Sequence, residues 1–143
     1  STNAADYESF IKINKPKYDD SWERWNRTLD MLKNLDTRTV LRITLIRDYN
    51  DQKEMIPAFA DMFRKASPHF IEIKSYMHIG RSTNRLEHEN MLEMHEVKRF
   101  SEQIAKQSKI FSVMDESLVS RISILQNNER FIDRYIPTYA NTN

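Results

Sequence analysis

The sequence contains no cysteine and only one glycine among its 143 residues. Without cysteine, the chain cannot form a disulfide, a thiolate-held zinc site or a cysteine-ligated iron–sulfur cluster from its own residues. A single glycine excludes the glycine-rich loops that cradle nucleotide phosphates. No apolar run approaches the roughly 20 residues that span a bilayer. We therefore expect no membrane partner.

The charge balance is nearly neutral, with 22 basic and 21 acidic side chains and a net charge of +1. No whole-molecule field then attracts nucleic acid, so any site for a polyanion must be a local patch. The first residues, STNAADYESF, do not resemble a secretory signal. Length and a hydrophobic content of 39% fit a single globular piece, 1–143, and we expect a cytoplasmic location.

Periodicity and turn signals divide the chain into alternating helices and strands. Apolar residues recurring every three or four positions predict helices over residues 6–13, 21–35, 53–66 and 95–107. Short runs rich in β-branched residues predict strands over residues 39–46, 70–76, 110–114 and 121–125. We expect a last helix over residues 128–135, followed by a polar tail.

The order of these elements predicts an α/β fold. From Thr39 onward the chain alternates strand, helix, strand, helix, strand, which favours parallel strands with helices packed on the sheet. The short spacer over residues 115–120 predicts a terminal antiparallel hairpin. The loop from Met77 to Leu92 is longer than the usual helix–strand connection of about 2–6 residues, and such loops are often functional.

One face of the two central strands is unusually polar. Because side chains alternate along a strand, Leu41, Ile43 and Leu45 face the helices, as do Ile71 and Ile73. The opposite face then carries a polar set: Arg42, Thr44, Glu72, Lys74 and Tyr76. Three interpretations stay open, namely a face open to solvent, a purely structural ladder of ion pairs, and the wall of a ligand cleft.

In the ligand interpretation, these residue types suit an acidic ligand at the carboxyl ends of the strands. Arg42 and Lys74 can bind a carboxylate or phosphate, Glu72 can bind a hydroxyl or amine, and a desolvated Lys74 can act as a Schiff-base nucleophile. The following loop adds His78, Arg81, Asn84 and Arg85, which can contact phosphate oxygens. A solvated loop with incidental charge is the alternative.

Five segments together resemble the radical SAM tRNA 4-demethylwyosine synthases of wybutosine biosynthesis. They are STNAADYESFIKINKP, DDSWERWNRTLDML, TRTVLRITLIRDYN, FIEIKSYMHIGRSTNRL and NMLEMHEVKRFSEQIAK. The resemblance covers residues 1–125 and implies the carboxyl-terminal part of a partial (β/α)6 radical SAM barrel. In that barrel STNA would end the fourth strand, and residues 39–46 and 70–76 would be the fifth and sixth. Residues 126–143 would form the terminal helix and tail.

The resemblance also implies an activity. Such enzymes are lyases that condense pyruvate with N1-methylguanosine beside the anticodon of phenylalanine tRNA, using S-adenosylmethionine and 4Fe-4S clusters. Their cluster cysteines lie in the amino-terminal half of the barrel, and this sequence has none. We therefore expect a piece that needs the missing amino-terminal half as its partner and is inactive alone. A split or degenerate gene, or a non-catalytic α/β module that binds RNA or a protein, is the alternative.

The resemblance further assigns roles by position. Lys74 and Glu72 would lie near pyruvate and the target base as catalytic residues. The residues implied for S-adenosylmethionine are Ser1, Asn3, Thr44, Tyr76 and Met77. Those implied for the substrate and the anticodon stem-loop of the tRNA are Arg42, His78, Arg81, Asn84 and Arg85. A truncated barrel would also leave the strand over residues 39–46 as an unpaired edge, which predicts self-association.

Overall fold

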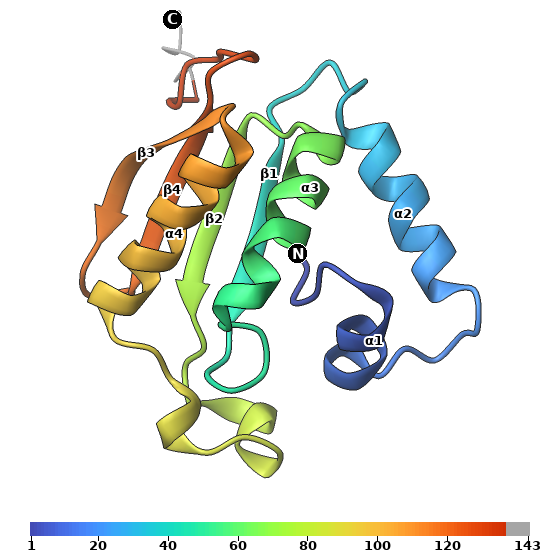
Figure 1. The fold of residues 1–143 in the computed structure, drawn as a ribbon, viewed down its shortest axis with the longest axis vertical. Helices are drawn as coiled ribbons and strands as arrows, with labels where there is room; N and C mark the ends of the chain where they lie inside the picture. Colours follow the sequence, from blue (N-terminus) through green and yellow to red (C-terminus); the bar gives the residue numbers. More distant parts are fainter. Residues whose placement is uncertain (137–143) are drawn as a thin grey trace, which may run out of the picture.

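A mixed sheet of four strands forms the centre of the computed structural model, which describes residues 1–136 of the chain (Figure 1). The strands stand in the order β1-β2-β4-β3 and span β1 Val40–Leu45, β2 Phe70–Ser75, β3 Phe111–Ser117 and β4 Ile122–Asn127. The helices are α1 Tyr7–Ser9, α2 Ser21–Leu32, α3 Ile56–Ala66 and α4 Met94–Ser108. No helix within residues 1–136 has the length and apolar character needed to cross a membrane.

Helices α3 and α4 cover one face of the sheet, where the predicted apolar set is buried (Figure 1). Ile43, Leu45, Ile71 and Ile73 are all fully buried there, so the predicted alternation of strand faces is confirmed. Helix α4 begins with a reciprocal cap, in which the side chains of Glu93 and Glu96 each accept a backbone N–H from the other end of the first turn. These contacts fix the helices that support β1 and β2.

The strand pairing differs in one respect from the prediction. β1 and β2 are parallel, with Val40 opposite Phe70 and Thr44 opposite Lys74. The third strand, β3, does not pair with β2, because β4 lies between them and is antiparallel to both. The hairpin therefore folds back into the sheet, where Leu125 of β4 reaches the core.

The amino-terminal segment adds a short pairing beyond β1. The amide of Thr2 donates to the carbonyl of Arg42 at 2.8 Å, and Thr2 forms a parallel bridge with Ile43. The predicted first helix is present as α1 continued by a π-helical turn, Phe10–Asn14. Lys15 ends that turn in the left-handed region, with φ of 47°. The edge of β1 is thus partly covered by its own chain.

The helix predicted over residues 128–135 is wrong, because residues 128–136 are irregular. Arginine side chains hold this segment instead of helical hydrogen bonds. Arg130 donates to the carbonyl of Ser67 at 2.6 Å, and Arg38 donates to the carbonyl of Asp133 at 2.7 Å. The predicted tail after residue 136 lies outside the described residues.

Candidate functional site

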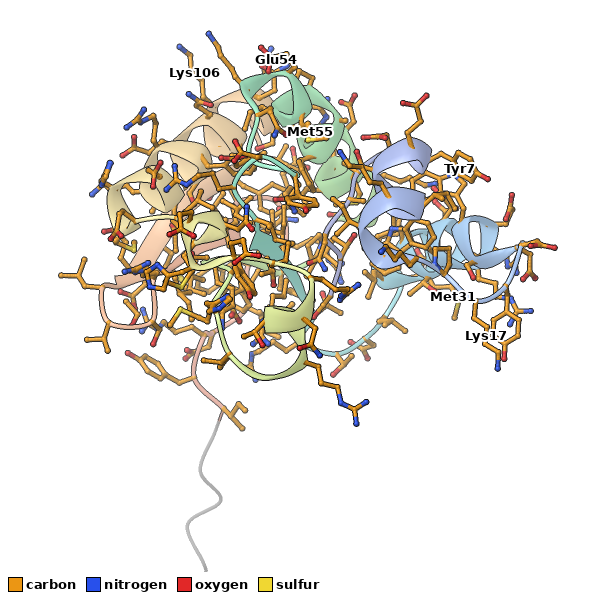
Figure 2. The ribbon with its side chains drawn as sticks, turned by 90° about the horizontal axis from the view of Figure 1, so that it is seen from below. Tyr7, Lys17, Met31, Glu54, Met55 and Lys106 are labelled. Atoms are coloured by element: carbon orange, nitrogen blue, oxygen red, sulfur yellow. The ribbon has the colours of Figure 1, made fainter. Side chains whose placement is uncertain are left out.

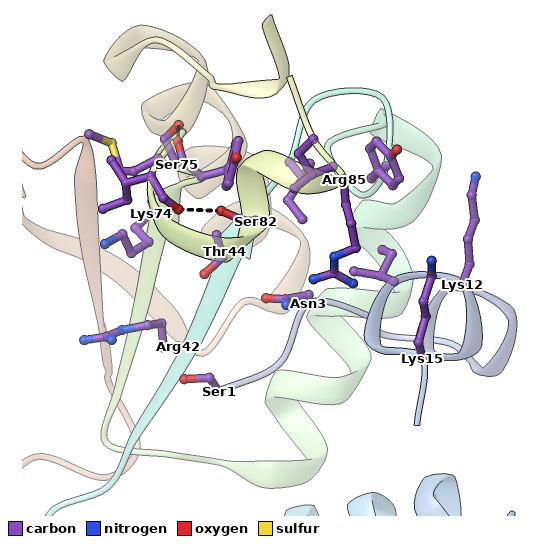
Figure 3. A pocket seen from close by; sticks show the side chains of 17 residues that line it. Ser1, Asn3, Lys12, Lys15, Arg42, Thr44, Lys74, Ser75, Ser82 and Arg85 are labelled. Atoms are coloured by element: carbon purple, nitrogen blue, oxygen red, sulfur yellow. Dashed lines mark hydrogen bonds between the residues drawn. The ribbon is translucent and has the colours of Figure 1, made fainter. Parts of the chain in front are cut away.

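A cavity of about 450 Å³ lies at the carboxyl ends of β1 and β2 (Figure 3). This volume falls in the range of small-molecule sites, about 300–1,000 Å³. Its walls are the amino terminus, the turn that ends at Lys15, the polar faces of β1 and β2, the turn after β1 and the loop after β2. The carboxyl ends of parallel strands are the usual position of ligand sites in α/β proteins.

Five cationic side chains line this cavity, and no carboxylate among residues 1–136 does. The cations are Lys12, Lys15, Arg42, Lys74 and Arg85. The absence of acids is informative because the chain has almost as many acidic as basic residues. Figure 3 shows Arg42 and Lys74 on the strands, with Lys12 and Lys15 on the opposite wall and Arg85 reaching in from the loop. Such a concentration of positive charge attracts an anion.

The strand wall contains one ion pair and one unpaired lysine. Arg42 Nε lies 2.8 Å from Glu72 Oε1, and Arg42 Nη2 donates to Glu72 Oε2 at 2.9 Å. Glu72 does not line the cavity but faces a separate hollow of about 240 Å³ beside Asp115. Lys74, further along β2, has no carboxylate within 4.0 Å among residues 1–136. A structural ion pair therefore accounts for Glu72, while Lys74 faces the cavity.

Hydrogen bonds fix the chain where it leaves β2. The amide of Tyr76 donates to the carbonyl of Leu45 at 2.7 Å, which ties the ends of the two parallel strands together. The Ser75 hydroxyl donates to the carbonyl of Tyr76 at 2.9 Å and accepts the amide of Leu92 at 2.8 Å. Tyr76 is buried, and its hydroxyl lies 3.1 Å from Nδ1 of His78. Tyr76 and Met77 consequently present a fixed backbone to the cavity.

The loop after β2 is held down by Arg47. Its guanidinium makes two hydrogen bonds to the carboxylate of Glu96, at 2.7 and 2.6 Å, and a third to the carbonyl of Glu89 at 3.0 Å. The Arg47 hydrogen bonds lower the pKa of Glu96 below its ordinary value and outweigh the opposing effect of burial. A loop that looks irregular in sequence is thus anchored to β1 and to the start of α4.

The same loop turns sharply at Gly80, the single glycine, whose φ is +65°. A 3₁₀ turn, Gly80–Asn84, follows, and the Ser82 hydroxyl donates to the carbonyl of Ile79 at 2.7 Å. This geometry brings Arg85 to the cavity, while Arg81 and Asn84 remain exposed outside its lining.

The structure brings together eight of the residues predicted for the site. Those lining the cavity are Ser1, Asn3, Arg42, Thr44, Lys74, Tyr76, Met77 and Arg85. The others, Glu72, His78, Arg81 and Asn84, lie around it without lining it. Sequence reasoning missed Lys12, Lys15 and Tyr49. Two lysines three positions apart were the available signal, but lysines near a helix end usually mark a solvated face.

In the described part of the chain, no three His, Asp or Glu side chains gather as a possible metal site. The sequence contains no cysteine. These residues do not fit an iron–sulfur cluster, which is usually held by thiolates.

Fold and site together define an α/β chain with a cationic cavity where its parallel strands end. Residues 65–127 match the family described as wyosine base formation. The chain is 40% identical over 135 residues to the S-adenosyl-L-methionine-dependent tRNA 4-demethylwyosine synthase of Methanocaldococcus jannaschii, covering 93% of this chain and 41% of that protein. It is 34% identical over 129 residues to the synthase of Pyrococcus abyssi, covering 90% and 37%.

Solved structures give the same relationship. A structure of TYW1 with a lysine-pyruvate adduct bound superimposes with a TM-score of 0.81 at 38% identity, covering 92% of this chain and 40% of that one. A crystal structure of archaeal TYW1 gives 0.72 at 33% identity, covering 92% and 39%. Residues 65–127 belong to the wyosine base formation family, and the chain is a homologue of one part of the tRNA 4-demethylwyosine synthases. It spans about two fifths of the length of these relatives.

Proposed function

We propose that this chain is part of a tRNA 4-demethylwyosine synthase of wybutosine biosynthesis. In this proposal its cavity binds the acidic reactant, and the rim of the cavity binds the tRNA. The carboxylate-free, cationic cavity carries the proposal. Pyruvate is an acid, and a related TYW1 structure contains a lysine-pyruvate adduct. The relatives are synthases, so a non-catalytic RNA-binding or protein-binding module is the less favoured function.

In this proposal Lys74 is the nucleophile that captures pyruvate. Its Nζ attacks the ketone carbon, a C–N bond forms, and water leaves as the imine is completed. Lys74 is partly buried on the strand wall, and no carboxylate within residues 1–136 competes for its Nζ. Arg42, on the same wall, is placed to hold the carboxylate of pyruvate. Glu72 acts through Arg42, whose guanidinium it orients.

Polar groups on the cavity wall suit S-adenosylmethionine. Ser1, Asn3 and Thr44 offer hydroxyl and amide groups, and Tyr76 and Met77 offer backbone groups. When bound, this cofactor supplies the radical that removes hydrogen from the methyl group of N1-methylguanosine. In the proposal, the iron–sulfur ligands come from the part of the synthase outside this sequence, which also completes a partial (β/α)6 barrel. The 143-residue chain alone is then inactive.

The rim of the cavity is assigned to the anticodon stem-loop of phenylalanine tRNA. Arg81, Asn84 and Arg85 are exposed on the loop after β2, and His78 stands beside Tyr76 at its base. Arginine and asparagine side chains bind phosphate and base edges from such positions. The Arg47 hydrogen bonds hold this loop in place for the contact.

Borohydride trapping tests the role of Lys74. In the full-length protein that contains this sequence, labelled pyruvate and borohydride should mark Lys74, as located by peptide mass spectrometry. Lys74→Ala should abolish the label, because the amine that forms the imine is removed. Lys33→Ala is the matched control, since Lys33 is an exposed lysine that does not line the cavity. Undiminished labelling of Lys74→Ala would show that another amine carries the reaction.

A further inference from the structure

Three cations on the outer wall of the cavity have no role in the capture of pyruvate. Lys12 and Lys15 come from the turn after α1, and Arg85 comes from the loop after β2. The fold brings together two segments that lie some seventy positions apart in the sequence (Figure 3). All three side chains are exposed, and none has a carboxylate within 4.0 Å among residues 1–136. Eight other lysines and arginines in that range do have such partners.

The backbone at Lys12 and Lys15 departs from regular α-helical geometry. Lys12 lies in the π-helical turn Phe10–Asn14, a geometry that occurs frequently at functional sites. Lys15 follows in the left-handed region at φ of 47°, which a lysine rarely adopts. Its amide still donates to the carbonyl of Ile11, at 3.2 Å. A strained residue of this kind, beside a cavity, is a reason to look for a ligand.

An aromatic ring stands beside the same cations. The Nζ of Lys12 lies 5.6 Å from the ring centroid of Tyr49, and both residues line the cavity. Tyr49 is partly exposed and lies in the turn after β1, where its amide donates to the carbonyl of Ile46 at 3.1 Å. Cations interleaved with an aromatic ring are the arrangement with which proteins bind single-stranded nucleic acid.

We propose that Lys12, Lys15, Arg85 and Tyr49 form a subsite for the phosphodiester backbone of single-stranded RNA. This inference rests on the proposed function, in which an RNA loop enters the cavity. The strand wall already provides Arg42 and Lys74 for a small acid. Lys12, Lys15 and Arg85 are three further cations without a neighbouring carboxylate among residues 1–136, and all three are exposed. They suit a polyanion that enters the cavity from solvent. Tyr49 then offers a face on which a base can stack.

The salt dependence of RNA binding tests the subsite. The full-length protein containing this sequence would be titrated with the anticodon stem-loop of phenylalanine tRNA and with a single-stranded oligouridylate. In a triple variant, Lys12→Gln, Lys15→Gln and Arg85→Gln, the slope of log K against log salt should fall by about 2, since each phosphate contact contributes about 0.7 on single strands. Affinity at low salt should fall at least about tenfold for both RNAs.

Lys17→Gln is the matched control. It removes a charge two positions from Lys15, but Lys17 does not line the cavity and lies at the periphery of the molecule (Figure 2). We expect an unchanged salt slope in this variant. Tyr49→Leu should weaken binding of both RNAs several-fold with little change of slope, because stacking releases no counterions. Equal effects of Lys17→Gln and the triple variant would overturn the subsite.

Other outcomes separate the subsite from the proposed function. If the triple variant loses pyruvate trapping but keeps its RNA salt slope, the wall serves the small acid and the subsite is wrong. If the slope changes as expected but the wild-type protein traps no pyruvate and does not prefer the stem-loop to oligouridylate, the subsite stands and the proposed function fails. If the wild-type protein binds neither RNA, both are overturned.

Discussion

At the scale of single residues, His69 shows how the fold selects a protonation state. It is buried at the start of β2, where its Nδ1 accepts the amide of Thr39 at 3.2 Å. Burial lowers the pKa of His69 below its ordinary value, and the positive charges of Arg130 and Arg38 lower it further. The neutral ring is therefore the form that fits the folded protein.

This predicts a stability that declines toward acid. Because the pKa of His69 is lower when folded than when unfolded, its contribution is complete above about pH 6.5 and is lost as the pH falls through the folded value. We expect the free energy of unfolding to decrease as the pH is lowered from 7.5 to 5.5, because protonation of His69 opposes the folded state. Urea titrations of wild type and His69→Asn measure it, and the variant should be flatter. The exposed His95→Gln should keep the wild-type slope.

Single residues also show how much of the cavity lining could be predicted from the sequence. Alternation along the strands identified Arg42, Thr44 and Lys74 as cavity residues, because that pattern depends only on which face is apolar. It could not separate Lys74 from Glu72, since the Arg42 ion pair that holds Glu72 depends on three-dimensional packing.

At the scale of elements, Arg47 joins three parts of the structure. Its hydrogen bonds connect the end of β1 to the carbonyls of Glu89 and Met91 in the loop and to Glu96 at the start of α4. The contact with Glu96 is bidentate and charge-assisted, the stronger kind of side-chain hydrogen bond. The end of the loop after β2 is anchored next to α4 for this reason.

Glu96→Gln should loosen this connection. Charged hydrogen bonds contribute about 1.5–3 kcal/mol, but both side chains retain contact with water, so we expect a loss of about 1 kcal/mol at pH 7. The pKa of Glu96 is lowered in the fold, so its stabilisation is complete above about pH 4.5 and is lost as the pH falls through the folded value. Denaturation at pH 7 and near pH 3 measures both, with the exposed Glu102→Gln as control. A penalty that persists at pH 3 would contradict this account.

Elements differ in how well local sequence determines them. The buried faces of α3 and α4 follow from periodicity. Phe59 and Phe63 recur at helical spacing in α3, and Val97, Phe100 and Ile104 do so in α4. The insertion of β4 between β2 and β3 does not, since strand order is a property of the whole sheet. The helix predicted over residues 128–135 failed because long-range hydrogen bonds hold this segment: Arg130 within it donates to the carbonyl of Ser67, and Arg38 from before β1 donates to the carbonyl of Asp133.

At the scale of the whole molecule, the outer edge of the sheet, formed by β1, is incompletely covered. The amide of Thr2 donates to the backbone carbonyl of Arg42, and the side chain of Asn50 donates to the carbonyl of Thr44 at 2.9 Å. Val40, at the start of β1, is 51% exposed. An exposed strand edge with an apolar side chain is a template for pairing with another chain. The edge is thus open at one end only.

Self-association of the 143-residue chain should therefore depend on Val40. We expect dimers or larger species at high concentration, and Val40→Lys should shift the population toward monomer, since a charged edge resists pairing. Light scattering after gel filtration measures the mass over a range of concentrations. Val119→Lys, at a still more exposed position in the β3–β4 turn, controls for the added charge. A wild-type chain that stays monomeric throughout would show that Thr2 and Asn50 protect the edge sufficiently.

The five cations of the cavity have one more consequence, for work at the bench and for the cell. In solution, such a concentration of positive charge recruits whatever small anions surround it, and phosphate or sulfate binds arginine and lysine better than chloride does. Every acidic ligand must then displace a competing anion. Its apparent dissociation constant rises by a factor of one plus the ratio of the competitor's concentration to the competitor's own dissociation constant. Affinities measured in phosphate buffer should consequently be weaker than those measured in chloride at the same ionic strength. Inside a cell, the local pool of inorganic phosphate would act as a tonic inhibitor of this site.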